Sequence, residues 1–176
     1  MKVLYWIGIV VLVLFVGLFF VRLVLPSQID DVTPGIFCEE EYLDLADVYY
    51  VIPKFKGVEI DEEWCGEMKK RASSSECRLP VAGCREKEIA MHGIYHTYNE
   101  FGVFRDIDYF DEGVEIFEEC FGVLPERFKS PQLAFAEENG WIRDRMEVDL
   151  FWNQVFHKVY HCSDTGILPN WLIRIY

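Results

Sequence analysis

Basic residues are scarce in this sequence. It holds 17 Lys and Arg residues against 30 Asp and Glu residues, which gives a formal net charge of −13 at pH 7. Nucleic acids and anionic lipid headgroups are themselves negative, so this balance disfavours both as partners. We therefore expect no nucleic-acid partner and interpret the negative charge as a contribution to solubility.

The sequence also lacks any C-x-x-C pair, which excludes the usual patterns of zinc ribbons and thioredoxin-type redox motifs. The six cysteines are Cys38, Cys65, Cys77, Cys84, Cys120 and Cys162. An even number in an exported domain predicts disulfides, although the sequence leaves the pairing open. Cys77 and Cys84 flank a short loop and are a candidate local pair. In a cytoplasmic domain the cysteines would instead be small buried hydrophobic residues.

No charged residue occurs between Val3 and Val21. About 20 apolar residues in a helix cross the hydrocarbon core of a bilayer, so residues 1–26 predict a transmembrane signal anchor. The segment Val24-Leu25-Pro26-Ser27 offers no A-x-A-like cleavage site, although a cleaved signal peptide is the alternative. We expect a single-pass protein of the cell membrane, with residues 27–176 forming one extracytoplasmic domain.

The rest of the sequence alternates strand and helix patterns. Strands are predicted at 28–32, 48–52, 88–92, 127–129, 154–162 and 171–176. Helices are predicted at 39–46, 61–71, 109–121 (with Asp108 as N-cap) and 130–140. Strands separated by helices predict an α/β fold with a parallel sheet or barrel. In such folds the ligand site lies at the carboxyl ends of the strands.

Polar residues stand at the ends of two predicted strands. Asp30 and Asp31 end the first, His92 ends the third, and His96 follows four residues later. One Asp and two His form a common ligand set for a divalent metal, and zinc is the metal we expect. A second Asp can then act as a base for the attacking water. Taken singly, the acidic pair can be a turn or cap, and the histidines surface imidazoles.

Three segments follow one another along the chain: Asp30-Asp31-Val32-Thr33-Pro34, Val51-Ile52-Pro53 and His92-Gly93-Ile94-Tyr95-His96. In order and strand context they resemble the polysaccharide deacetylase superfamily, most closely a branch with an Asp-Asp-Val-Ser/Thr-Pro start and a His-Gly-x-x-His motif. The resemblance covers essentially all of residues 27–176. It implies a distorted or incomplete (β/α) barrel of the polysaccharide deacetylase type, which hydrolyses an acetyl group on a carbohydrate substrate.

The resemblance also implies a role for each residue of the site. Asp30 would be the catalytic base, and the metal ligands would be Asp31, His92 and His96. The metal would polarise the acetyl carbonyl and stabilise the developing oxyanion. A late histidine protonates the leaving group in this family, and His161 is our candidate.

His157 and His161 repeat the four-residue spacing of the first histidine pair, which leaves a four-histidine metal site as an alternative. Residues four apart on a strand are separated by about 13 Å, too far to share one ion. The objection would not apply if this segment were helical, so we keep His161 as the candidate acid and leave His157 in reserve. The family's third motif, an Arg and a Pro-aromatic pair, is incomplete here, because Gln132 follows Pro131.

The short distance in sequence between Asp30 and the apolar run suggests a lipid-linked or envelope glycan as the substrate. A protein of a different class remains open: a catalytically silent carbohydrate-binding or envelope-assembly protein that retains the fold. A third interpretation is a disulfide-stabilised adhesion or scaffold domain, in which the histidines are incidental.

Overall fold

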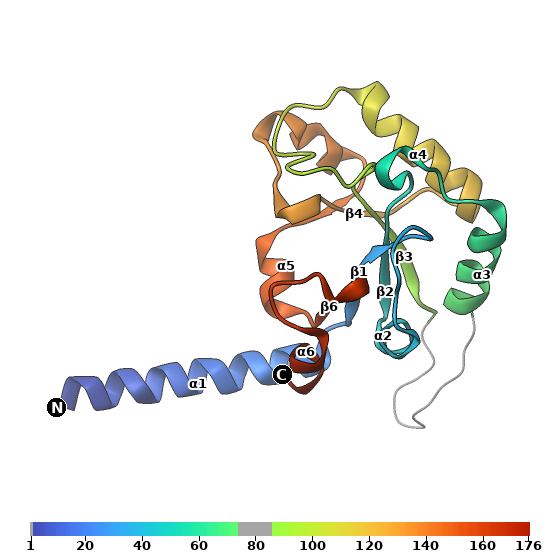
Figure 1. Cartoon of the computed structure of the whole chain (residues 1–176). Coiled ribbons are helices and arrows are strands. Elements are labelled where there is room, and N and C mark those ends of the chain that lie inside the picture. Colours follow the sequence, from blue (N-terminus) through green and yellow to red (C-terminus); the bar gives the residue numbers. More distant parts are fainter. Residues whose placement is uncertain (1, 74–85) are drawn as a thin grey trace.

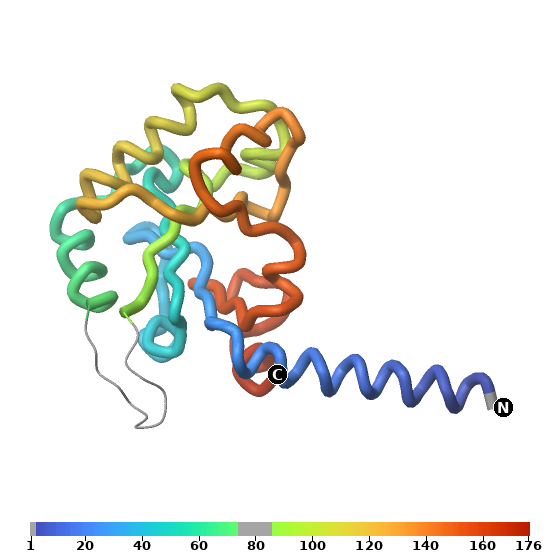
Figure 2. The backbone as a smooth tube through the Cα atoms, turned by 180° about the vertical axis from the view of Figure 1, so that it is seen from behind, coloured from blue at the N-terminus to red at the C-terminus, as the bar shows by residue number. Residues whose placement is uncertain are grey.

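A computed structural model describes residues 2–73 and 86–176 of the chain (Figure 1). The first helix, α1 (Lys2–Val24), projects away from the rest of the molecule in both views (Figures 1 and 2). It is long and apolar enough to cross a membrane, and most of its side chains are exposed. A membrane span and a signal sequence share this length and composition.

Beyond α1, the described residues form an α/β structure around one curled sheet of six parallel strands, which amounts to half a barrel. The strands are β1 (Gln28–Val32), β2 (Val48–Val51), β3 (Glu88–His92), β4 (Arg127–Lys129), β5 (Glu147–Asp149) and β6 (Val159–His161). Their order across the sheet is β5-β4-β3-β2-β1-β6. The last strand therefore pairs with the first, and the α/β part of the fold prediction is confirmed.

The connecting helices are α2 (Glu40–Leu45), α3 (Glu62–Ser73), α4 (Ile107–Phe121), α5 (Phe151–Phe156) and α6 (Asn170–Ile175). Short 3-10 segments cover Phe55–Gly57, Pro131–Leu133, Glu137–Asp144 and Cys162–Asp164. The helices α3 and α4 pack against each other on one side of the sheet (Figure 1).

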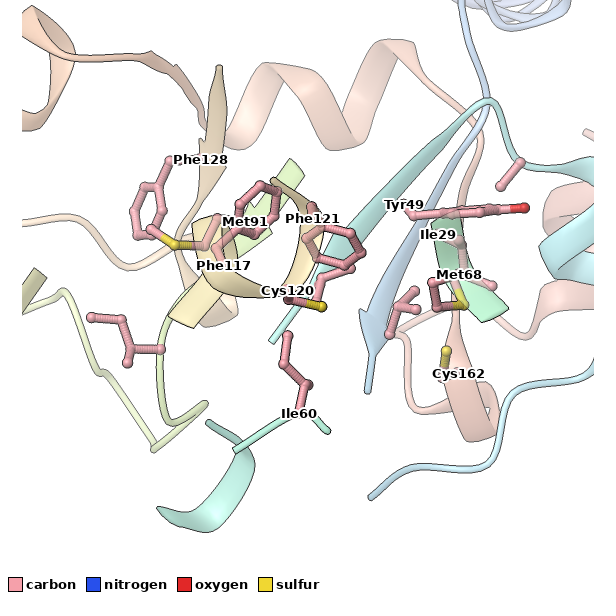
Figure 3. Packing of buried hydrophobic residues seen from close by; sticks show 14 of the residues in the cluster. Ile29, Tyr49, Ile60, Met68, Met91, Phe117, Cys120, Phe121, Phe128 and Cys162 are labelled. Carbon is pink, nitrogen blue, oxygen red and sulfur yellow. The ribbon is translucent and has the colours of Figure 1, made fainter. Parts of the chain in front are cut away.

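The main hydrophobic core lies between the sheet and these two helices. Phe117 and Phe121 of α4 meet Met91 of β3 and Phe128 of β4 in this core (Figure 3). Strand β2 contributes to both faces of the sheet, because successive side chains of a strand alternate. Tyr49 belongs to the main core, whereas Val48, Tyr50 and Ala90 form a separate buried group.

Two disulfides join distant parts of the chain, which confirms the disulfide prediction for four of the cysteines. Cys38 pairs with Cys162, and Cys65 on α3 pairs with Cys120 on α4. The first links the segment after β1 to the residue that follows β6. The candidate local pair of Cys77 and Cys84 lies outside the described residues.

Several predicted elements are wrong in the last third of the chain. Residues 171–176, predicted as a strand, fall mostly in α6, which starts directly after Pro169. Residues 154–162, predicted as one strand, are divided between α5 and β6. Both segments are short apolar runs, and hydrophobic periodicity alone does not distinguish strand from helix over such lengths.

Two further predictions need correction, and one strand was not predicted. Residues 130–140 form two 3-10 segments instead of one helix. Strand β5 was not predicted. The N-cap of α4 is Asp106 rather than Asp108, because Asp106 Oδ1 accepts a hydrogen bond from the Tyr109 backbone N–H at 2.9 Å. Asp108 lies within the first turn, where its charge still complements the helix dipole.

Candidate metal site

The carboxyl ends of the strands bring the predicted site residues to one edge of the sheet. Asp30 and Asp31 lie near the end of β1, His92 ends β3, and His161 ends β6. Because the strands are parallel and β1 lies beside both β2 and β6, these ends meet at the same edge. The placement agrees with the expectation from the sequence.

Three side chains converge on a point where a metal ion could be held. Asp31, His92 and His96 each offer one ligand atom, and these atoms lie within 4.8 Å of one another. Asp31 Oδ1 is 2.8 Å from His96 Nε2 and 3.3 Å from His92 Nε2. Asp31 and His92 are 5% and 4% exposed. A buried carboxylate with two imidazoles suits a divalent ion, with coordination positions left for substrate or water.

The backbone of β1 departs from regular strand geometry at this point. In a regular strand, Asp30 and Asp31 would face opposite sides of the sheet. The pairing register of β1 with β2 shifts between Ile29 and Val32, and Asp31 has a φ of 65°. A left-handed conformation of this kind typically costs about 1–3 kcal/mol and is concentrated at functional sites. The irregularity allows both carboxylates to reach the strand-end edge.

His96 reaches the site because the chain turns sharply after β3. Gly93 has a φ of 62° and His96 a φ of 56°. A Cβ atom at Gly93 would lie 2.5 Å from both Glu100 Oε2 and Pro131 Cγ, so only glycine fits. The strand-spacing argument, which was made for His157 and His161, therefore does not bear on His92 and His96, because only His92 lies in the strand. Their ring centroids are 5.0 Å apart.

A buried carboxylate holds this turn in place. Glu100 is fully buried and accepts backbone hydrogen bonds from Ile94, Tyr95 and His96 at 2.9–3.3 Å. Its Oε1 also accepts a hydrogen bond from the Tyr109 hydroxyl at 2.7 Å. Three successive N–H groups directed at one carboxylate fix the path of the backbone that carries His96. This role of Glu100 was not predicted, because nothing in the sequence around it indicates that it folds back on the preceding loop.

Hydrogen bonds orient the ligand atoms. His92 Nδ1 lies 3.0 Å from the Lys129 carbonyl oxygen and must donate to it, which leaves Nε2 free to face a metal. The Thr165 hydroxyl donates to Asp31 Oδ2 at 2.8 Å, so Oδ1 is the oxygen that faces the histidines. Partners of this kind fix the tautomer of the imidazole and the rotamer of the carboxylate.

Asp30 lies beside the metal group with partners of its own. Its Oδ1 accepts a hydrogen bond from Lys129 Nζ at 2.8 Å, and its Oδ2 accepts one from Gln154 Nε2 at 3.2 Å. Lys129 is fully buried, with its ammonium 3.8 Å from the centroid of the Tyr50 ring. Burial lowers the pKa of Lys129 below its ordinary value, although the Asp30 carboxylate acts in the opposite direction.

The basic residue that contacts Asp30 is Lys129, which was not predicted as a site residue. Arg127, two residues earlier on β4, pairs instead with Asp149 at 2.9 Å. Strand alternation places Arg127 and Lys129 on the same face. Of the two basic residues on this face, Lys129 is nearer the carboxyl end of β4, where the site was expected. Its position in the strand is therefore the signal that could have identified it.

The two remaining histidines lie at opposite ends of β6. His161 Nε2 is 3.7 Å from Asp30 Oδ2, so His161 belongs to the site. Its Nδ1 is buried and has no hydrogen-bond partner among the described residues. His157 precedes the strand, and its Nδ1 contacts the Pro26 carbonyl oxygen at 2.8 Å. The arrangement does not support a four-histidine site.

The charges within the metal group are strongly coupled. Burial alone would raise the pKa of the Asp31 carboxyl, but its hydrogen bonds to His92 and His96 outweigh burial and hold that pKa well below its usual range. Burial would lower the pKa of His92, but the hydrogen bond to Asp31 and the charges of Asp30 and Asp31 raise it overall. Without a metal, the Asp31 carboxylate therefore stabilises the protonated form of His92, in opposition to burial.

The chain matches no model of a known protein family and no curated protein. Its resemblance to the polysaccharide deacetylases therefore stays a prediction from the motifs, and the functional argument depends on the geometry of the site.

Proposed function

We propose that this protein is a divalent-metal-dependent hydrolase of the polysaccharide deacetylase type, which removes acetyl groups from a carbohydrate. The observation that carries the proposal is the position of Asp30 and His161 directly beside the Asp31, His92 and His96 group. A metal site with a second carboxylate and a further imidazole at its edge provides a base and an acid in addition to the ligands.

A divalent ion held by the three ligands would polarise the acetyl carbonyl and stabilise negative charge on its oxygen. Asp30 accepts a proton from the water that attacks this carbon. Lys129 and Gln154 hold the Asp30 carboxylate in place, one on each oxygen. His161 donates a proton from Nε2 to the departing sugar amine or alcohol as the bond to the acetyl carbon breaks. Acetate and the deacetylated sugar are the products.

We further propose that α1 remains attached as a single-pass membrane anchor and that the domain is extracytoplasmic. The disulfides Cys38–Cys162 and Cys65–Cys120 support this location, because stable disulfides form in oxidising compartments. Gln28, the first residue of β1, lies only four positions after the end of α1 at Val24. A glycan that is itself attached to a lipid or to the envelope is therefore the substrate that we propose.

Metal content and acetate release, measured on the full-length protein in detergent, test the proposal. The wild type should bind about one divalent ion per chain and release acetate from N- or O-acetylated oligosaccharides. His92→Ala should lose both properties. Asp30→Asn, which leaves the ligands intact, should keep the metal and lose acetate release.

Two outcomes would contradict the proposed hydrolase activity. Folded protein that binds no divalent ion would exclude the metal site. Metal-loaded protein that binds acetylated oligosaccharides without releasing acetate would favour the catalytically silent binding protein.

A further inference from the structure

The helices α5 and α6 lie on the side of the molecule from which α1 projects (Figures 1 and 2). Both helices carry exposed aromatic and aliphatic side chains. We call these side chains the basal apolar residues: Phe151, Trp152 and Phe156 on α5, and Trp171 and Ile175 on α6. Trp152 is 64% exposed and Trp171 is 58% exposed. Within each helix, the pairs 152/156 and 171/175 are four residues apart and so lie on one face.

The contact between the end of the chain and α1 fixes the position of α6 relative to a membrane. The ring of Tyr176, which directly follows α6, stacks on Phe15 with centroids 4.5 Å apart. The guanidinium of Arg22 lies 5.1 Å from the same ring. Phe15 lies about 10 Å nearer the N-terminal end of α1 than Arg22, at about 1.5 Å per residue. If the apolar run of α1 occupies the hydrocarbon core, Tyr176 and the end of α6 must reach the membrane interface.

The helix α5 is held to the same base. It packs against α1, and the residue that follows it, His157, contacts the Pro26 carbonyl oxygen at 2.8 Å. On its exposed side, the rings of Trp152 and Phe156 stack at 5.8 Å. Tryptophan and tyrosine are enriched where a protein meets the interface of a bilayer, because their rings combine an apolar body with a polar group.

We propose that α5 and α6 rest in the headgroup–acyl boundary of the bilayer that α1 enters, so that the domain lies on the membrane surface instead of hanging from a flexible tether. This inference depends on the proposed anchoring by α1 and not on the proposed chemistry. The net charge of −13 indicates that the contact is apolar and does not need anionic lipids.

This docking would bring the site close to the membrane. The opposite side of α5 faces the site, because Gln154 donates to Asp30 and Asn153 donates to Asp149 at 2.8 Å. A single short helix then separates the bilayer from the Asp30 carboxylate, and a helix with its side chains is about 10 Å thick. A substrate carried on a membrane lipid would reach the site without leaving the surface.

Quenching of tryptophan fluorescence by brominated phosphatidylcholine tests the docking in full-length protein reconstituted into uncharged phosphatidylcholine vesicles. Trp6→Phe removes the tryptophan of α1. Docking predicts that this variant is still quenched, that Trp6→Phe/Trp152→Phe/Trp171→Phe loses most of the quenching, and that high salt has no effect. The matched control Trp6→Phe/Trp64→Phe/Trp141→Phe, whose two changes beyond α1 lie on α3 and in the Glu137–Asp144 segment, should remain quenched.

Quenching that disappears with Trp6→Phe alone would overturn the docking while leaving the anchor intact. Wild-type protein that is not quenched at all would overturn the anchoring as well. Neither result bears on acetate release, so a failure of the docking is distinguishable from a failure of the proposed enzyme activity. A stable dimer that shields Trp152 and Trp171 from the brominated lipid would assign the basal apolar residues to a second copy of the chain and would also overturn the inference.

Discussion

The two H-x-x-x-H pairs of this chain have the same spacing in sequence but different arrangements in space. His92 and His96 lie side by side, with ring centroids 5.0 Å apart and Asp31 between them. His157 and His161 are separated by the length of β6, with one imidazole at Pro26 and the other at Asp30. The backbone between them makes the difference. The chain turns at Gly93 and brings His96 beside His92, whereas an extended strand keeps His157 and His161 apart.

A direct comparison of the pairs should give the largest effect. Each ligand to a metal contributes a bond that the other ligands do not replace, so His96→Ala should weaken divalent-metal binding by at least about 100-fold. His157→Ala should leave the affinity unchanged, because its imidazole lies at the opposite end of β6. Isothermal titration with zinc measures both. Similar losses in the two variants would mean that the second pair contributes to the metal site.

Of the second histidine pair, only His161 should contribute to catalysis. If His161 is the acid, His161→Gln should reduce kcat for acetate release by about 10²–10⁴-fold without loss of the metal. The same substitution at His157 should leave kcat unaltered. A kcat that is unchanged in His161→Gln would assign the acid to another group.

The turn that brings His96 beside His92 can be destabilised by a substitution that leaves all three candidate ligands unchanged. Glu100→Gln removes the negative charge that accepts hydrogen bonds from the backbone N–H groups of Ile94, Tyr95 and His96. It should weaken metal binding by about 10–100-fold. The matched control is Glu112→Gln, because Glu112 contacts the Tyr95 hydroxyl at 2.7 Å but not the backbone of the turn. The visible spectrum of bound cobalt(II) should change in Glu100→Gln only. Equal spectra would show that Glu100 stabilises the fold without orienting His96.

The smallest effect is that of pH on the first pair. His92 must lose its proton to bind a metal, and Asp31 raises the pKa of His92 above 6.5 despite the opposing effect of burial. Apparent metal affinity should therefore rise with pH by up to about tenfold per unit until the pH passes this raised pKa. Titrations across a pH series check the slope. An affinity independent of pH would contradict the raised pKa of His92.

The stability of the metal-free protein should show the opposite trend. A pKa raised on folding stabilises the native state below the unfolded value, and this stabilisation is lost as the pH rises through the folded-state pKa. Thermal unfolding of chelator-treated protein should therefore show a lower Tm above the raised pKa of His92 than below it, once the contributions of other groups are subtracted with His92→Gln.

The group that could hold a metal was predictable in part, because a general rule places ligand sites at the carboxyl ends of parallel strands, and Asp31 and His92 stand at two such ends. His96 needed the further knowledge that the chain turns at Gly93. Lys129 and Glu100 were missed because each acts through a contact with residues distant in sequence or folded back in space. The family and its chemistry stay predictions.

The helix α6 illustrates why part of the fold was not predictable. Its residues Trp171 to Ile175 are aromatic, aliphatic and β-branched apart from Arg174, a composition that also suits a strand. Tertiary contacts decide the conformation. Ile173 is buried in the core, and Tyr176 packs on Phe15 of α1. A contact with a helix at the other end of the sequence leaves no mark in the local pattern.

The position of β6 beside β1 has a consequence for the order in which the protein is assembled. Ribosomes make β1 before the other five strands, and β6 is the last of the six, so the first strand has no partner on that side until the other strands have been made. Contacts between such distant segments form slowly, because a long loop has to close. The bridge between Cys38 and Cys162, which are 124 residues apart, then locks this late step. His161 and Thr165 arrive with that final strand, so the site becomes complete only when the fold itself is closed.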